Sequence, residues 1–230
     1  QETSNTYEGF GLSITNLRYA FANGVTFGAH LNNTTLKNRD LRAVLGKPRR
    51  FSVSVTNSQY RRSYSFDDAS STRRKQTGIQ ASYQPSRFFK FTGGYSLTGE
   101  TATILAHTLD TVISSTDYRQ TAYNIGAQMG DRFGIVRVDY RHSQFDDRLV
   151  SDADRTSDRL AVSASSSVPG MKRVFLAGGY TFQKDTSLSW ESSLRTNEIW
   201  GALKAGFNDG FSAEYRFVYD MTKHVGFLRE

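Results

Sequence analysis

The amino-acid sequence predicts an all-β fold: an antiparallel up-and-down transmembrane β-barrel of about twelve strands, with short turns on one side and long loops on the other. Segments of about ten residues alternate between apolar and polar side chains, which is the two-residue period of a β-strand. Tight turns and longer polar loops join these segments in alternation, as in membrane barrels. No segment approaches the run of about 18 apolar residues that a membrane helix needs. Strands are therefore the expected spanning elements.

The clearest strand pair covers residues 123–140. Its apolar face is made by Tyr123, Ile125, Ala127, Met129, Val136, Val138 and Tyr140. Its other face carries Arg137, Asp139 and, one position beyond the pair, Arg141. A soluble β-sandwich buries its apolar face, whereas a membrane barrel turns that face toward lipid. The corresponding faces of the other segments are almost purely apolar, which favours the membrane barrel.

The remaining strands follow in chain order from the same alternation. We expect strands over residues 10–21, 25–31, 41–45, 51–66, 77–83, 89–97, 123–129, 133–140, 160–164, 174–182, 199–205 and 211–219. A parity change predicts a bulge near Thr15 and Asn16, and Asn23-Gly24 is a strong hairpin signal because both residue types accept positive φ. The segments predict a single domain over residues 1–230, or a part of a larger barrel.

The tight turns share a local motif. A cation stands immediately before a strand and is mostly followed by an aromatic residue, as in Arg50-Phe51, Arg87-Phe88 and Arg132-Phe133. Aromatic side chains gather at membrane interfaces, so these positions predict an aromatic belt. The expected interface anchors are Phe51, Phe88, Phe133 and Phe211.

The strand positions that alternate with the apolar ones are expected to line a lumen. They are Lys90, Arg137, Asp139, Arg141, Arg159, Lys204, Glu214, Arg216 and Asp220. Because charge rings set the selectivity of pores, this net-positive set favours a water-filled lumen for anionic solutes. An equally weighted interpretation is a small lumen closed by internal pairs of arginine and carboxylate side chains.

Residues 100–115 lie in the expected loop between residues 98 and 117. Apolar residues at helical spacing within it are typical of a short amphipathic helix. The candidates for a constriction inside the lumen are Ile104, Leu105, Leu109 and Val112. A surface loop packed on its neighbours is the favoured alternative, because one helical match in a loop is weak evidence.

The net charge of +7 and the isoelectric point of about 9.6 predict an anionic partner. Five basic residues surround one expected loop: Arg61, Arg62, Arg73, Arg74 and Lys75. They fit the phosphates of lipopolysaccharide through charge-assisted hydrogen bonds, although an ordinary solvated loop rim is the favoured explanation. No nucleic-acid-binding module surrounds them, so nucleic acid is not an expected partner.

No pattern in the sequence predicts catalysis or a cofactor. Cysteine is absent, and the four histidines show no ligand spacing, so no metal site is expected. No nucleophile-elbow, P-loop or dinucleotide motif occurs, and we expect no enzymatic activity. The expected partners are membrane lipids and lipopolysaccharide.

The pattern as a whole resembles Gram-negative outer-membrane β-barrels, which implies location in the bacterial outer membrane. In length and charge the chain is similar to small basic porins, and this likeness implies passive diffusion of acidic solutes. The segments Tyr-Arg-His-Ser-Gln-Phe-Asp-Asp (140–147) and Ala-Gly-Gly-Tyr-Thr-Phe-Gln-Lys-Asp (177–185) are similar to strand ends in the MtrB/PioB-like barrels of porin–cytochrome conduits. That second resemblance implies a sheath around a multihaem cytochrome. A soluble β-sheet binding or adhesion module is the third hypothesis.

Overall fold

The structure is a computed structural model that describes residues 11–36, 38–63, 71–105, 112–131, 133–150, 153–168, 170–171, 173–187, 192–206 and 212–225. These residues form twelve strands. They are β1 (Ile14–Ala20), β2 (Thr26–Asn32), β3 (Arg39–Lys47), β4 (Phe51–Ser63), β5 (Ser71–Ser86), β6 (Phe89–Leu105), β7 (Val112–Gly130), β8 (Gly134–Asp147), β9 (Arg155–Ser167), β10 (Val174–Ser187), β11 (Ser192–Gly206) and β12 (Ser212–Val225).

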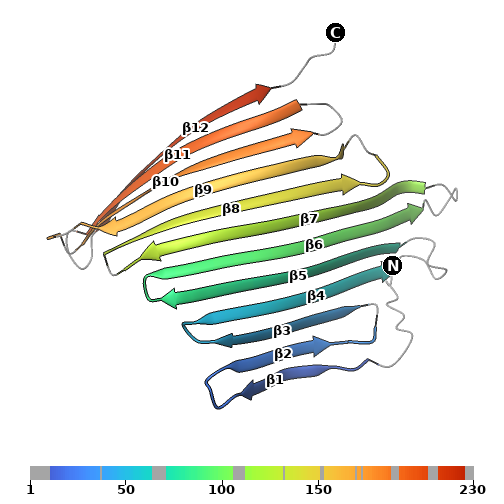
Figure 1. Cartoon of the computed structure of the whole chain (residues 1–230). Helices are drawn as coiled ribbons and strands as arrows, with labels where there is room; N and C mark the ends of the chain where they lie inside the picture. Colours follow the sequence, from blue (N-terminus) through green and yellow to red (C-terminus); the bar gives the residue numbers. More distant parts are fainter. Residues whose placement is uncertain are drawn as a thin grey trace, which may run out of the picture. The chain divides into compact units, whose positions relative to one another are not determined.

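All twelve strands belong to one sheet, and their order in the sheet is their order in the chain (Figure 1). The residue contacts divide the chain into two compact units. The first unit holds residues 1–81, 94–122 and 144–154, and the second holds residues 82–93, 123–143 and 155–230. The predicted all-β, antiparallel, up-and-down arrangement is confirmed. The prediction of a single domain stays a prediction.

The first unit begins with two local features that the sequence predicts. The pairing of β1 with β2 shifts between Ile14 and Leu17, and Asn16 has a φ of 60°, so the expected bulge is present. Gly24 has a φ of 79°, and its backbone N–H donates to the carbonyl of Phe21 over 3.0 Å. The Asn23-Gly24 hairpin is therefore confirmed, because glycine enters this region of φ without steric cost.

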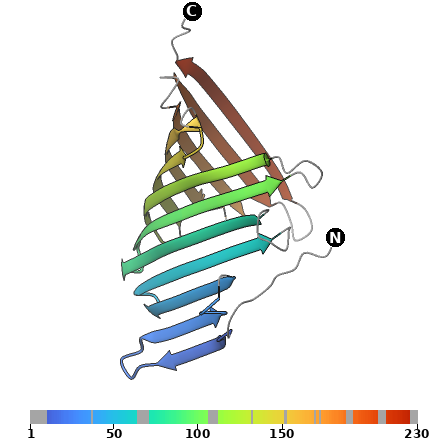
Figure 2. The same cartoon turned by 90° about the vertical axis from the view of Figure 1, so that its right-hand side faces the viewer.

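The second unit contains β9 to β12, which lie side by side in both views (Figure 2). Directly opposite residues of antiparallel strands point to the same side, so the register defines two faces. The apolar face of these strands consists of Leu160, Val162, Ala164, Leu176, Gly178, Tyr180, Ile199, Gly201, Leu203, Tyr215, Phe217 and Tyr219. The opposite side is called the charged face, and on these strands it includes Arg159, Phe175, Glu198, Trp200, Lys204, Glu214, Arg216 and Asp220.

Side chains of the apolar parity are largely exposed in the described parts of the second unit. Within the described ranges, the buried hydrophobic residues are Ala29, Leu36 and Ala122. By contrast, Ile125 is 63% exposed and Tyr215 is 68% exposed. A water-soluble β-sandwich buries its apolar face against a second sheet, so this exposure argues against the soluble alternative.

The described parts of the chain contain no helix with the length and hydropathy of a membrane-spanning segment.

Several strands extend farther than the alternation predicts. Strand β6 continues to Leu105 and β7 begins at Val112, so most of the expected loop between residues 97 and 117 is strand. The favoured surface loop and its alternative, a short helix over residues 100–115, are therefore both wrong for these two stretches. Residues 106–111, which include Leu109, lie outside the described ranges. Polar residues such as Thr98, Thr101 and Thr103 are compatible with a strand whose two faces are both hydrated.

Candidate functional site: the charged face

The nine residues predicted to line a lumen all lie on strands of the second unit. On β11 and β12 the register places Lys204 directly opposite Glu214 and Ala202 directly opposite Arg216, so these groups share one face. Arg159 joins them from β9, because it lies opposite Gln183 on the same side as Phe175.

On β6, β7 and β8, the surroundings of Gly126 show which residues share one side of the sheet. A Cβ atom at Gly126 would lie 2.5 Å from Oδ1 of Asp139 and 2.6 Å from Oγ1 of Thr92. Asp139 and Thr92 therefore meet above Gly126 on one side of the sheet. Lys90, Arg137 and Arg141 belong to the same side, since they are two residues away from Thr92 or Asp139.

Two ion pairs on the charged face run along single strands. The Nε atom of Arg137 lies 3.3 Å from Oδ2 of Asp139, and NH2 of Arg216 lies 3.4 Å from Oε1 of Glu214. All four side chains are about half exposed or more. Exposed ion pairs contribute little to stability, roughly 0–1 kcal/mol. Their charges thus remain available to act on ions in solution.

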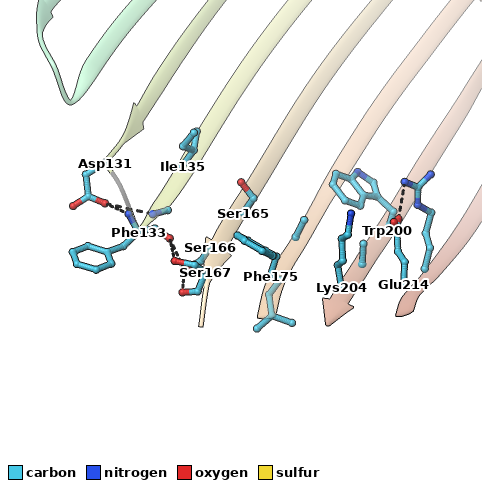
Figure 3. A pocket seen from close by; sticks show the side chains of 15 residues that line it. Asp131, Phe133, Ile135, Ser165, Ser166, Ser167, Phe175, Trp200, Lys204 and Glu214 are labelled. Carbon is cyan, nitrogen blue, oxygen red and sulfur yellow. Dashed lines mark hydrogen bonds and ion pairs between the residues drawn. The ribbon is translucent and has the colours of Figure 1, made fainter. Parts of the chain in front are cut away.

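A pocket of about 490 Å³ lies at the short-turn end of the charged face (Figure 3). Its charged lining is Asp131, Lys204, Glu214 and Arg216. Its apolar lining includes Phe133, Ile135, Phe175, Leu176 and Trp200. The pocket therefore combines aromatic rings with cations and carboxylates, a surface that fits a small polar solute with one apolar side.

Phe175 and Trp200 are the residues of this pocket that sequence reasoning missed. Both stand at positions of the polar parity, which the alternation treats as the face of charged groups. The sequence did contain a signal for an aromatic residue on the charged face, because Trp200 lies between Glu198 and Lys204 on the same parity of β11. Aromatic residues among charges on one parity indicate a surface that is only partly polar.

The position of Trp200 depends on Gly179, the residue directly opposite it on β10. A Cβ atom at Gly179 would lie 2.7 Å from Nε1 of the Trp200 indole and 2.8 Å from the backbone oxygen of Val162. The indole ring thus covers the backbone of Gly179. Any side chain at position 179 would push both the ring and a neighbouring strand.

We expect Gly179→Ala to lower the free energy of unfolding by about 1–3 kcal/mol, because the added methyl group is overpacked against backbone and indole. Urea unfolding in detergent micelles measures this change. Gly93→Ala is the matched control, since a Cβ there meets its nearest atom at 3.7 Å. The control should be neutral or slightly stabilising, as alanine is better than glycine within a strand. Equal stability of both variants would contradict the packing of Trp200 on Gly179.

The charged face also carries ionisable groups beyond the predicted set. Glu198 lies directly opposite Asp220, so two carboxylates meet on neighbouring strands. Asp185 of β10 and Arg155 of β9 share this side by strand alternation. Sequence reasoning missed Asp185 and Arg155 because they lie three and five positions beyond the expected strands. It also missed Glu198, although this residue stands one position before an expected strand, as Arg159 does.

Three of the four predicted interface anchors are described by the structure, and they lie at the short-turn ends. Phe51 is the first residue of β4, and Phe88 and Phe133 stand in the turns before β6 and β8. The guanidinium carbon of Arg87 lies 4.7 Å from the ring centroid of Phe88, a cation–π contact. Phe211 lies outside the described ranges.

A cluster of polar side chains lies on the apolar side of β7 to β9, at the end far from the short turns. The Tyr140 hydroxyl donates to Oδ1 of Asp158 over 2.6 Å, and Nδ1 of His142 lies 2.8 Å from the same oxygen. The ring of Tyr123 stacks on His142 with centroids 4.9 Å apart. The cluster marks the level at which this face changes from apolar to polar.

The basic residues predicted around a loop lie on strands where the structure describes them. Arg61 and Arg62 belong to β4, and residues 73–75 belong to β5. Arg73 and Lys75 line a pocket of about 470 Å³ in the first unit, together with Arg119 and Arg148. The pocket also contains Asp117, whose Oδ1 lies 3.7 Å from NH1 of Arg148. This pocket is another basic surface on the chain.

Within the described ranges, no cluster of three or more His, Cys, Asp or Glu side chains is placed to hold a metal ion. Of the constriction candidates, Ile104 and Leu105 lie in β6 and Val112 lies in β7. Their role as a constriction stays a prediction.

The sequence matches neither a protein-family model nor a curated protein. Two solved structures of OmpT, described as an outer membrane protein of Vibrio cholerae, are similar to this chain. The trimer form has a TM-score of 0.51 at 10% identity, covering 90% of this chain and 79% of that chain. A second structure of in-vitro folded OmpT has the same TM-score and identity and covers 90% and 77%. At this identity the likeness concerns the fold alone: the chain has the antiparallel, up-and-down fold of outer-membrane β-barrel proteins.

Proposed function

We propose that this chain is an outer-membrane β-barrel that forms a passive pore for small anionic solutes. The observation that carries the proposal is the register of β9 to β12. It places a continuous apolar face on one side of the sheet and charged groups on the other. A membrane barrel turns the first toward lipid and the second toward water.

The lengths of the strands support this assignment. A tilted strand crosses a bilayer with about ten residues. Strands β9 to β12 have 13 to 15 residues each, so each can span and still reach the water on one side. The exposed aromatic residues Phe88 and Phe133 at the short turns suit one membrane interface.

The charges support the preference for anions. On the described strands of the second unit, the charged face carries seven cations: Lys90, Arg137, Arg141, Arg155, Arg159, Lys204 and Arg216. It carries five carboxylates: Asp139, Asp185, Glu198, Glu214 and Asp220. An excess of cations along a pore raises the local concentration of anions and favours their passage.

The proposal is tested by recording ion currents from the purified protein in planar bilayers of neutral lipid. We expect stable conductance steps and, in a salt gradient, a reversal potential on the anion-selective side. A protein that stays soluble without detergent would overturn the membrane assignment. A membrane protein that does not conduct and co-purifies with a Soret-absorbing cytochrome would replace the pore by the sheath of an electron conduit.

A further inference from the structure

Three cations form a row across β10, β11 and β12 at the end of the apolar face far from the short turns. Lys184 lies directly opposite Arg195, and Arg195 lies directly opposite Lys223. Lys184 is half-buried, and Arg195 and Lys223 are exposed. By strand alternation all three share the side of Tyr180, Ile199 and Tyr219. We call these three residues the cation row.

Like charges directly opposite each other on neighbouring strands destabilise a sheet. Among the described residues of β9 to β12 that share this side, the one carboxylate is Asp158, which lies opposite Lys184 on β9. Its Oδ1 atom already accepts a hydrogen bond from Tyr140 and contacts His142. One shared carboxylate balances three cations incompletely. The arrangement therefore has the charge of a binding site for an anion.

The surroundings of the cation row indicate what kind of anion it is. One step toward the short turns, the same face presents Phe182, Asn197 and Met221, and beyond them Tyr180, Ile199 and Tyr219. One step in the other direction it presents Thr186 and Ser193. The row thus stands at the boundary between a tall apolar surface and a polar one. An amphiphile with phosphate groups above acyl chains fits both parts at once.

The height of the row agrees with this occupant. Each of the three cations lies about ten residues from the short-turn end of its strand, which is the length that spans a bilayer. Phosphates of a lipid headgroup lie at that level. Lysine and arginine bind phosphate through charge-assisted hydrogen bonds.

We propose that Lys184, Arg195 and Lys223 bind the phosphate groups of a phosphorylated glycolipid of the lipid A type, with its acyl chains against the apolar face. This inference rests on the proposed membrane location but not on conductance. Each basic residue near an anionic lipid surface contributes about 1 kcal/mol, which corresponds to about fivefold in affinity. Loss of all three should weaken binding about a hundredfold.

The test places the refolded protein in neutral phosphatidylcholine vesicles, with or without diphosphorylated lipid A, and measures thermal unfolding and lipid binding. The variant carries Lys184→Gln, Arg195→Gln and Lys223→Gln. The matched control removes three cations from the charged face: Arg159→Gln, Lys204→Gln and Arg216→Gln. We expect lipid A to raise the midpoint temperature of the wild type and of the control, but not of the cation-row variant.

Three results would overturn the inference. They are an unchanged lipid response in the cation-row variant, an equal response to lipid A without phosphates, and an equal response to inorganic phosphate alone. If the triple variant does not fold in neutral lipid, Arg195→Gln alone takes its place, with an expected loss of about fivefold in affinity. Conductance of the same samples in neutral bilayers reports on the pore separately. The cation-row variant should conduct as the wild type does, so failure of the pore and failure of the lipid site are distinguishable.

Discussion

Leu203→Arg should lower the free energy of unfolding in lipid bilayers by about 1–2 kcal/mol, because Leu203 lies three residues from the short-turn end of β11. A cation on the lipid-facing side of a barrel costs about 2–4 kcal/mol at the bilayer midplane and about 0–1 kcal/mol at the interfaces, and this position lies between the two. Leu203 lies on the apolar face between Leu176 and Tyr215 and is 41% exposed in the chain alone. The guanidinium would have to leave water or draw water into the bilayer. Urea unfolding in phospholipid vesicles, followed by fluorescence, gives the difference.

The preceding residue provides the control. Ala202 points to the opposite side and lines the pocket that also contains Lys204 and Arg216. Ala202→Arg introduces the same side chain on the same strand at nearly the same depth, but on the charged face. It should change stability by much less than Leu203→Arg. A larger loss for Ala202→Arg than for Leu203→Arg would reverse the assignment of the two faces.

The second large effect concerns ion selectivity. Replacing Lys204 and Arg216 together by Glu changes four units of charge around one pocket. The reversal potential in a salt gradient should then change sign, from anion-selective to cation-selective, because charged rings set the preference of a pore. Both side chains are exposed, so the fold should form. The midpoint of urea unfolding checks that expectation.

The control for this experiment is a change of the same kind outside the proposed lumen. Lys184→Glu and Lys223→Glu reverse two cations on the apolar-face side, where ions in a pore do not pass, and also change four units of charge. Their reversal potential should equal that of the wild type. An unchanged reversal potential in the Lys204→Glu, Arg216→Glu variant would contradict the pore assignment of the charged face.

The alternation of side chains predicted the class of fold and most of the strand pairs. It worked because a one-residue shift in the register of β11 would move Ile199, Gly201 and Leu203 to the wrong side together, so the pattern of each strand specifies its pairing. Asn23-Gly24 predicted its hairpin for a similarly local reason, since few residues accept its backbone angles.

The extent of the strands was less predictable. The outer parts of β6 and β7 carry threonine, serine and charged residues on both sides, so no period-2 contrast remained to distinguish strand from loop. Hydrogen bonds between the two strands, which depend on no side-chain pattern, continue the pairing there. Trp200 was missed for a different reason: its place depends on the absence of a side chain at Gly179, which is 21 positions earlier in the chain.

Trp200 also provides an optical reporter inside the proposed pore. The chain has two tryptophans, Trp190 and Trp200, and replacing Trp190 by Phe isolates the emission of the second. The indole of Trp200 faces the pocket with Lys204 and Glu214 and not the apolar face. Its fluorescence therefore senses solutes and quenchers dissolved in the aqueous pocket, whereas quenchers carried on lipid tails are separated from it by the sheet. The indole ring that covers Gly179 would therefore report the entry of a solute into the pocket in real time.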